Sequence, residues 1–87
     1  MSKVSFTLHL KRFIDNLESI EISADDVYGL MNKLKAVYPE LNNYVLDEHG
    51  SLRKDVNITI DGEQIQDPVY LTDSLNSESD VQILPVL

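Results

Sequence analysis

The sequence predicts one α+β domain, in which a mixed sheet of four to five strands is covered by one main helix. Three observations predict it. Apolar and polar residues alternate at residues 4–10 and 56–60, the spacing becomes helical between residues 27 and 38, and alternation returns at residues 81–84. With 87 residues there is room for one hydrophobic core, so residues 1–87 are assigned to a single domain.

The first expected strand covers residues 4–10 (VSFTLHL), whose period of two is typical of a half-buried strand. Its apolar residues would face the core, and its outward face would carry Ser5, Thr7 and His9. A second alternating segment contains Ile20 and Ile22. Two strands so close in the sequence predict a hairpin.

The main helix is expected between residues 27 and 38, because apolar side chains recur there every three or four positions. These are Val27, Leu30, Met31, Leu34, Val37 and Tyr38. Ser23 or Asp25 is expected to cap its start, and Pro39 to end it. Gly29 is expected where the helix passes close over a strand.

The segment after the helix begins with an expected helical turn near residues 41–46 and a loop. Residues 56–60 (VNITI) form the next expected strand, and Asp61-Gly62 predicts a tight turn into a short strand around Gln64 and Ile65.

The C-terminal part is expected to contain one helical turn at residues 72–74 and a last strand at 81–84, ended by Pro85. This order of elements is that of a β-grasp fold, in which the first and last strands lie side by side and parallel in the centre of the sheet.

Composition excludes several classes of function. The absence of cysteine excludes disulfides, thiol catalysis and cysteine-ligated zinc, and a net charge of −8 argues against nucleic acid as a partner. No apolar run reaches membrane-spanning length, so we expect a cytoplasmic protein that binds no membrane. The two histidines, His9 and His49, have no convergent partners in the sequence. We therefore expect no enzyme activity, no metal and no cofactor.

Acidic residues are concentrated in the second half of the chain. Ten of the fifteen follow Pro39, where only Arg53 and Lys54 oppose them. Two explanations stay open: a solvated surface, or electrostatic steering toward a basic rim around a partner's active site, with Asp61, Glu63 and Asp67 among the steering groups.

Residues 46–65 (LDEHGSLRKDVNITIDGEQI) resemble the small sulfur-carrier family: the molybdopterin-synthase small subunit (MoaD-like), the thiamine sulfur carrier (ThiS-like) and the carriers of cysteine biosynthesis. The matching positions there are Leu46, Asp47, Gly50, Leu52, Arg53, Val56, Asn57, Ile60, Gly62 and Ile65. Further matches are Val37, Tyr38 and Pro39, then Leu71, Thr72, Leu75, Asp80, Val81, Ile83 and Pro85.

The resemblance implies a ubiquitin-like β-grasp fold and a carrier function. In that family an E1-like adenylyltransferase activates a C-terminal Gly-Gly, which becomes a thiocarboxylate. The sulfur then passes to a biosynthetic enzyme, such as one of the molybdopterin-synthase large-subunit type. The sequence departs from this pattern, because its last residues are Leu84-Pro85-Val86-Leu87. Two interpretations stay open: the chain continues to Gly-Gly, or it is a non-conjugating β-grasp interaction module, for example of the phage tail-assembly type.

The family's usual partner surface is the outer face of the sheet together with the C-terminal tail. The resemblance therefore implies a partner-binding site made of Thr7, Asn57, Thr59, Gln82, Leu84, Pro85, Val86 and Leu87. The alternative is a sheet face that simply meets water.

Overall fold

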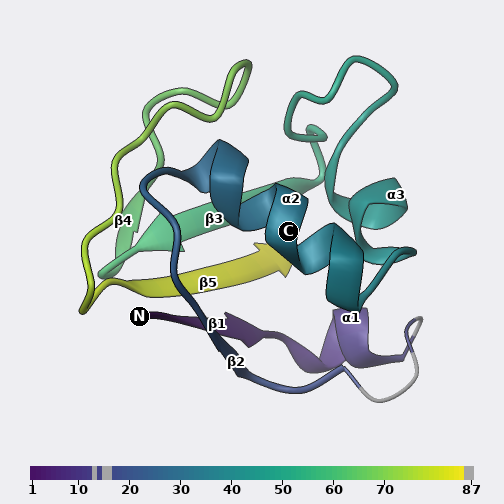
Figure 1. Ribbon diagram of the computed structural model, residues 1–87. Coiled ribbons are helices and arrows are strands. Elements are labelled where there is room, and N and C mark those ends of the chain that lie inside the picture. Colours follow the sequence, from purple (N-terminus) through teal and green to yellow (C-terminus); the bar gives the residue numbers. More distant parts are fainter. Residues whose placement is uncertain (13, 15–16, 86–87) are drawn as a thin grey trace.

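A computed structural model describes residues 1–12, 14 and 17–85, and its five strands form one mixed sheet (Figure 1). The strand order is β2-β1-β5-β3-β4, in which β1 and β5 are parallel and all other neighbours are antiparallel. The strands are β1 (Ser2–Phe6), β2 (Ile20–Ile22), β3 (Val56–Ile60), β4 (Glu63–Gln64) and β5 (Asp80–Pro85). The predicted mixed sheet, with first and last strands parallel at its centre, is confirmed.

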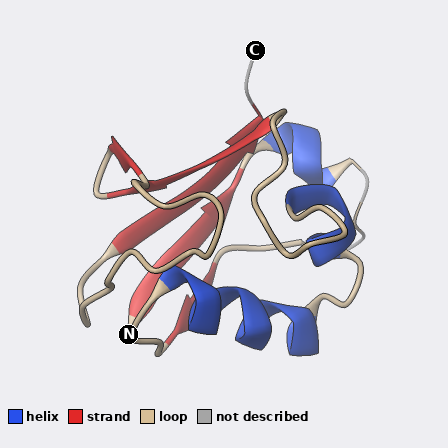
Figure 2. Cartoon of the chain, turned by 90° about the horizontal axis from the view of Figure 1, so that it is seen from above, coloured by secondary structure: helices blue, strands red, loops and turns tan. Residues whose placement is uncertain are grey.

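One face of the sheet is covered by the main helix, α2 (Val27–Val37) (Figures 1 and 2). Two shorter helices, α1 (Leu8–Lys11) and α3 (Leu41–Val45), lie toward the end of the sheet at which β5 finishes. The core between α2 and the sheet contains fully buried side chains from every layer, including Val4, Leu30, Leu34, Ile58 and Ile83.

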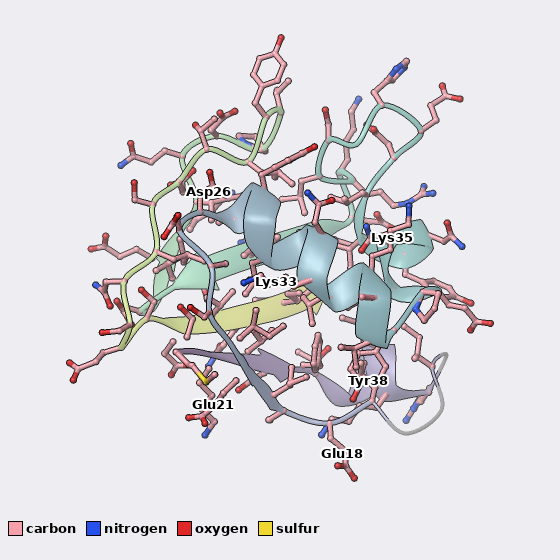
Figure 3. The ribbon with its side chains drawn as sticks, in the orientation of Figure 1. Glu18, Glu21, Asp26, Lys33, Lys35 and Tyr38 are labelled. Atoms are coloured by element: carbon pink, nitrogen blue, oxygen red, sulfur yellow. The ribbon has the colours of Figure 1, made fainter. Side chains whose placement is uncertain are left out.

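Helix α2 is capped by Asp26, not by the expected Ser23 or Asp25 (Figure 3). Asp26 has an extended backbone, and its Oδ1 accepts a hydrogen bond of 2.7 Å from the Gly29 amide. A Cβ at Gly29 would lie 3.2 Å from that same Oδ1. The glycine therefore makes room for the cap, and the expected close approach to a strand is wrong.

The last turn of α2 buries only part of the predicted apolar stripe. Val37, expected in the buried stripe, is 51% exposed. Tyr38 is the C-cap, and its ring packs edge-on against Phe6 with the centroids 6.3 Å apart (Figure 3). The Tyr38 hydroxyl also accepts a 3.3 Å hydrogen bond from the Glu18 amide, which joins the end of α2 to the segment before β2.

The first strand is shorter than predicted. It ends at Phe6, and the Thr7 carbonyl accepts a hydrogen bond from the Lys11 amide at 3.2 Å, which starts α1. His9 consequently lies in a helix and not on a strand. Leu10 is nevertheless buried. Its apolar side chain fits the alternating pattern of a strand, although the residue belongs to a helix.

The expected helical turn at residues 72–74 is also wrong. Leu71 has a left-handed backbone (φ 59°), and Ser74 forms a β-bridge with Asp26. The Asp73 carboxylate holds the segment by accepting from the amides of Gln66 and Asp67 at 2.9 and 2.8 Å. The bridge to Asp26 and the bonds to Gln66 and Asp67 replace local helical bonds.

The hairpin at Asp61-Gly62 is confirmed. Both residues have positive φ, 52° and 88°, which is the backbone of a tight turn between β3 and β4.

Candidate functional site

The candidate site is the face of the sheet opposite α2. Because side chains alternate along each strand, the residues between the core positions of β1, β3 and β5 all point to this outer face. The strand register places four of them in one row across the sheet: Ser5, Gln82, Thr59 and Gln64. A second row, nearer to where the chain leaves β5, pairs Leu84 with Asn57.

Three oxygen atoms here are buried and have no hydrogen-bond partner among the described residues. They are Oγ1 of Thr7, Oδ1 of Asn57 and Oγ1 of Thr59. Buried polar atoms in folded proteins nearly always have a partner, because an unpaired one costs free energy. All three belong to the predicted partner-binding residues, so the structure brings an unusual set of acceptors to that face.

The end of β5 continues this face toward the C-terminus. Gln82 is exposed, Leu84 is half-buried, and Pro85 closes the strand opposite Val56. The predicted residues Val86 and Leu87 lie outside the described residues. Since β1 and β5 are parallel, the N-terminus lies at one end of the sheet and the chain leaves β5 at the other (Figure 2).

Sequence reasoning missed two residues of the outer face, Lys3 and Gln64. Lys3 pairs with Asp80 on β5 and with Glu21 on β2, and Gln64 pairs with Thr59. Lys3 escaped notice because the expected strand started at residue 4. If the alternation is counted from Ser2, which is buried, Lys3 falls on the outer face.

Among the described residues, the surroundings of His49 supply no second site. His49 lies on an exposed loop, with Nε2 3.5 Å from the Glu48 carboxylate. In the described part of the chain, no group of three or more histidine, aspartate or glutamate side chains is placed to hold a metal ion. No helix of this part is both long and apolar enough to cross a bilayer.

Two loop carboxylates accept hydrogen bonds that stabilise their own loops. Asp47 accepts from the His49 amide at 2.8 Å and the Ser51 amide at 3.0 Å, and the first of these bonds is the main reason why its pKa is lowered. The pKa of Asp67 is lowered chiefly by the Thr72 hydroxyl, which donates to its Oδ2 at 2.6 Å. Both acids hold their loops in place through these hydrogen bonds.

Comparison with known proteins shows the fold. No protein-family model matches the chain, and no curated protein matches its sequence. Among solved structures, CysO from Mycobacterium tuberculosis, described as an antigen, aligns with a TM-score of 0.85 and 24% identity over the whole of both chains. A chain of the BexX/CysO complex from Amycolatopsis orientalis aligns with a TM-score of 0.86 and 16% identity, covering 100% of this chain and 97% of the other.

An archaeal protein shows the same likeness. The small archaeal modifier protein 1 of Methanosarcina acetivorans aligns with a TM-score of 0.78 and 24% identity, over 99% of this chain and 92% of the other. These neighbours are ubiquitin-like β-grasp proteins of the small sulfur-carrier type. The predicted α+β, ubiquitin-like β-grasp fold and the resemblance at the level of the fold are therefore confirmed.

Proposed function

We propose that this protein is a sulfur carrier of the ubiquitin-like type, which binds enzymes through the outer face of its sheet and presents the chain beyond β5 to them. One observation carries the docking site: the buried oxygens of Asn57 and Thr59, which have no partner among the described residues, belong to the outward positions of β3, and that of Thr7 follows directly after β1. A protein that covers this face would contact the accessible side chains around these atoms, such as the exposed Gln82 and the half-buried Leu84.

The likeness to carriers supports the chemistry. An E1-like adenylyltransferase would transfer AMP from ATP to a C-terminal glycine carboxylate and release pyrophosphate. A sulfide donor would then displace AMP and leave a thiocarboxylate, whose sulfur attacks a substrate in a second enzyme, one of the molybdopterin-synthase large-subunit type. The small domain supplies the reacting group and the docking surface, and the partner enzymes supply the catalysis. That one neighbour was solved as a BexX/CysO complex supports a protein partner.

The test compares the chain as printed with a version extended by Ala-Gly-Gly. Each is incubated with an E1-like enzyme, ATP and a sulfide donor, and its intact mass is measured. We expect one oxygen to be replaced by sulfur in the extended version only. No exchange with any of several E1-like enzymes would contradict the carrier function and favour the β-grasp interaction module.

The docking site has its own matched pair of variants. Thr59→Arg places a long cation on the outer face, whereas Asn32→Arg makes the same change in charge and bulk on the exposed side of α2. In the extended chain, Thr59→Arg should slow sulfur loading and Asn32→Arg should not. Equal rates for both variants would show that the enzyme does not use the sheet face.

A further inference from the structure

A group of exposed apolar side chains lies where the start of α2 meets the loop between β4 and β5. Among the described residues six large apolar side chains are exposed, and three of them come from these two segments: Tyr28 is 58% exposed, Val69 52% and Tyr70 74%. We call these three residues the tyrosine surface. Tyrosine often carries binding energy in protein interfaces, because its large ring loses little conformational entropy when it is covered.

Backbone hydrogen bonds bring the two segments together. The Tyr28 amide donates to the Leu71 carbonyl at 2.9 Å, and the Val27 amide donates to the Asp73 carbonyl at 3.1 Å. Figure 1 shows the start of α2 beside the loop that precedes β5. The helical tyrosine is therefore adjacent to the turn that carries the other two residues.

The turn at residues 67–71 is fixed by its own groups. Oδ1 of Asp67 accepts hydrogen bonds from the amides of Val69 and Tyr70 at 3.2 and 3.0 Å. Leu71 has a left-handed backbone, which costs a leucine free energy, and its side chain is buried in the core. The buried leucine anchors the turn while its two neighbours stay exposed. A surface fixed in this way loses little entropy when a partner binds.

A second loop supports this turn. The Ser51 hydroxyl donates to the Val69 carbonyl at 3.0 Å, and the Leu52 amide donates to the Pro68 carbonyl at 2.7 Å. Three segments that are far apart in the sequence therefore hold the tyrosine surface in place.

The surroundings of the tyrosine surface are acidic. Residues 24–32 and 66–75 contain no lysine or arginine but four acids: Asp25, Asp26, Asp67 and Asp73. In the part of the chain that the structure describes, no lysine or arginine forms an ion pair with any of the four. The carboxylates that fix the turn and the start of α2 do so by accepting from amides and a hydroxyl, so no cation neutralises them.

The bases of neighbouring segments do not reverse this sign. Lys33 follows Tyr28 by five residues, so at about 100° per residue it lies on the other flank of α2, where its ammonium donates to the Ser23 carbonyl. Figure 3 shows Lys35 nearer to the C-terminal end of α2. Two bases and two acids line one hollow there: Lys35, Arg53, Asp47 and Glu48. Even with these residues included, acids outnumber bases by six to three.

We propose that the tyrosine surface is a docking site for an arginine-bearing segment of another protein. The face of a tyrosine ring attracts a cation, and arginine suits it better than lysine, because a planar guanidinium stacks on the ring while it pairs with a carboxylate. The surrounding acids supply these carboxylates and attract a basic segment from a distance. A second copy of the chain is disfavoured as the occupant, since two such acidic surfaces repel each other.

The tyrosine surface is separate from the face proposed for enzyme docking. Helix α2 covers one face of the sheet, and the outer face lies on the opposite side (Figure 2). A protein bound at the start of α2 therefore leaves the outer face and the end of β5 open to an enzyme. This inference goes beyond the sulfur-carrier function and does not depend on it.

The experiment is an NMR titration of the full chain at low ionic strength with three hexapeptides, made of arginine, lysine or glutamate. The arginine peptide should shift the amides of residues 24–29 and 67–73. It should bind about threefold more tightly than the lysine peptide, because of the stronger interaction of arginine with an exposed ring. The glutamate peptide should shift neither range. Binding should weaken near 0.15 M salt, where the screening length is about 8 Å.

Two double variants separate the rings from the acids around them. Tyr28→Leu/Tyr70→Leu removes both rings and should weaken binding of the arginine peptide about tenfold, whereas Tyr28→Phe/Tyr70→Phe keeps the rings and should leave it within about twofold. Both side chains are largely exposed, so neither variant opens a cavity in the core. Tyr44→Leu makes the same change on α3 and should also leave binding within about twofold.

Four results would overturn the proposal. Three concern the peptides: arginine-peptide shifts spread evenly over the surface, equal affinity for the arginine and glutamate peptides, or equal weakening by the leucine and phenylalanine double variants. The fourth is a shift of the same amides on dilution without any peptide, which would assign the tyrosine surface to a second copy of the chain. The absence of sulfur loading would leave the peptide results unaffected, so the two proposals are tested separately.

Discussion

Replacing Thr59 by valine should make the protein more stable. Thr59 lies within β3, between Gln82 of β5 and Gln64 of β4, and its Oγ1 is buried without a partner. Valine has the same shape with a methyl group in place of the hydroxyl, and it has a higher preference for strands. An unsatisfied buried group costs roughly 1–3 kcal/mol. Since the substitution removes that cost at one atom, we expect a gain of about 1 kcal/mol in the free energy of unfolding.

The matched control is Thr72→Val, the same chemical change where the hydroxyl is used. Thr72 donates to Asp67 Oδ2 at 2.6 Å, so its loss should destabilise the loop and raise the pKa of Asp67 toward its ordinary value of 3.8. Urea unfolding followed by circular dichroism measures both variants. A gain of about 1 kcal/mol raises the melting temperature of a domain of this size by roughly 4–8 °C.

The essential result is that Thr59→Val raises the free energy of unfolding whereas Thr72→Val lowers it. If Thr59→Val destabilised the protein as much as Thr72→Val, the Thr59 hydroxyl would have a partner in solution, and the docking argument would lose one of its three oxygens. If Thr59→Val is more stable yet loads sulfur more slowly, this face maintains unpaired acceptors for binding at a cost in stability.

Three further predictions concern α2 and the loops. Leu34→Ala should cost roughly 2–5 kcal/mol in urea unfolding, because Leu34 is fully buried, whereas Val37→Ala in the same helix should stay within about 0.5 kcal/mol; similar costs would refute the assigned helix face. Asp26→Ala should cost about 1 kcal/mol through loss of the N-cap, measured in the same way, and no change would mean that another residue caps the helix. The pKa of Asp67 is lowered in the folded state, so its contribution is present at neutral pH and lost as the pH falls below 3.8; Asp67→Asn should flatten stability against pH between about pH 5 and pH 2, and an unchanged profile would contradict this.

The sequence was sufficient to predict the elements whose pattern is set by one face of a regular structure. Alternation in residues 56–60 and 81–84 identified the central strands, and helical spacing identified α2. The prediction failed where contacts between different segments determine the local structure. The Leu8–Leu10 alternation continues the strand pattern into a helix. The segment near Leu71 is shaped by the bonds that Asp73 accepts from the Gln66 and Asp67 amides and by the bridge between Ser74 and Asp26.

The candidate site, too, could be predicted only in part from the sequence. Alternation places Asn57, Thr59 and Gln82 on the outer face, but whether their polar atoms have partners depends on neighbouring strands that the sequence does not show. The position of Arg53 and Lys54 beside the end of β5 was hidden for a similar reason. In the linear sequence Arg53 and Lys54 stand among acids, and only the pairing of Val56 with Pro85 brings them to the end of β5.

The parallel pairing of β1 with β5 also determines how the domain resists mechanical force. The amino group of Met1 is held near the start of β5 by a 2.8 Å bond to the Ser77 carbonyl, while the chain leaves β5 at the opposite end. Tension applied between Met1 and Pro85 therefore shears the ladder that joins Lys3–Phe6 to Asp80–Ile83, loading its hydrogen bonds together instead of opening them one by one. A partner enzyme that grips the chain beyond β5 would pull along the direction in which the sheet is strongest.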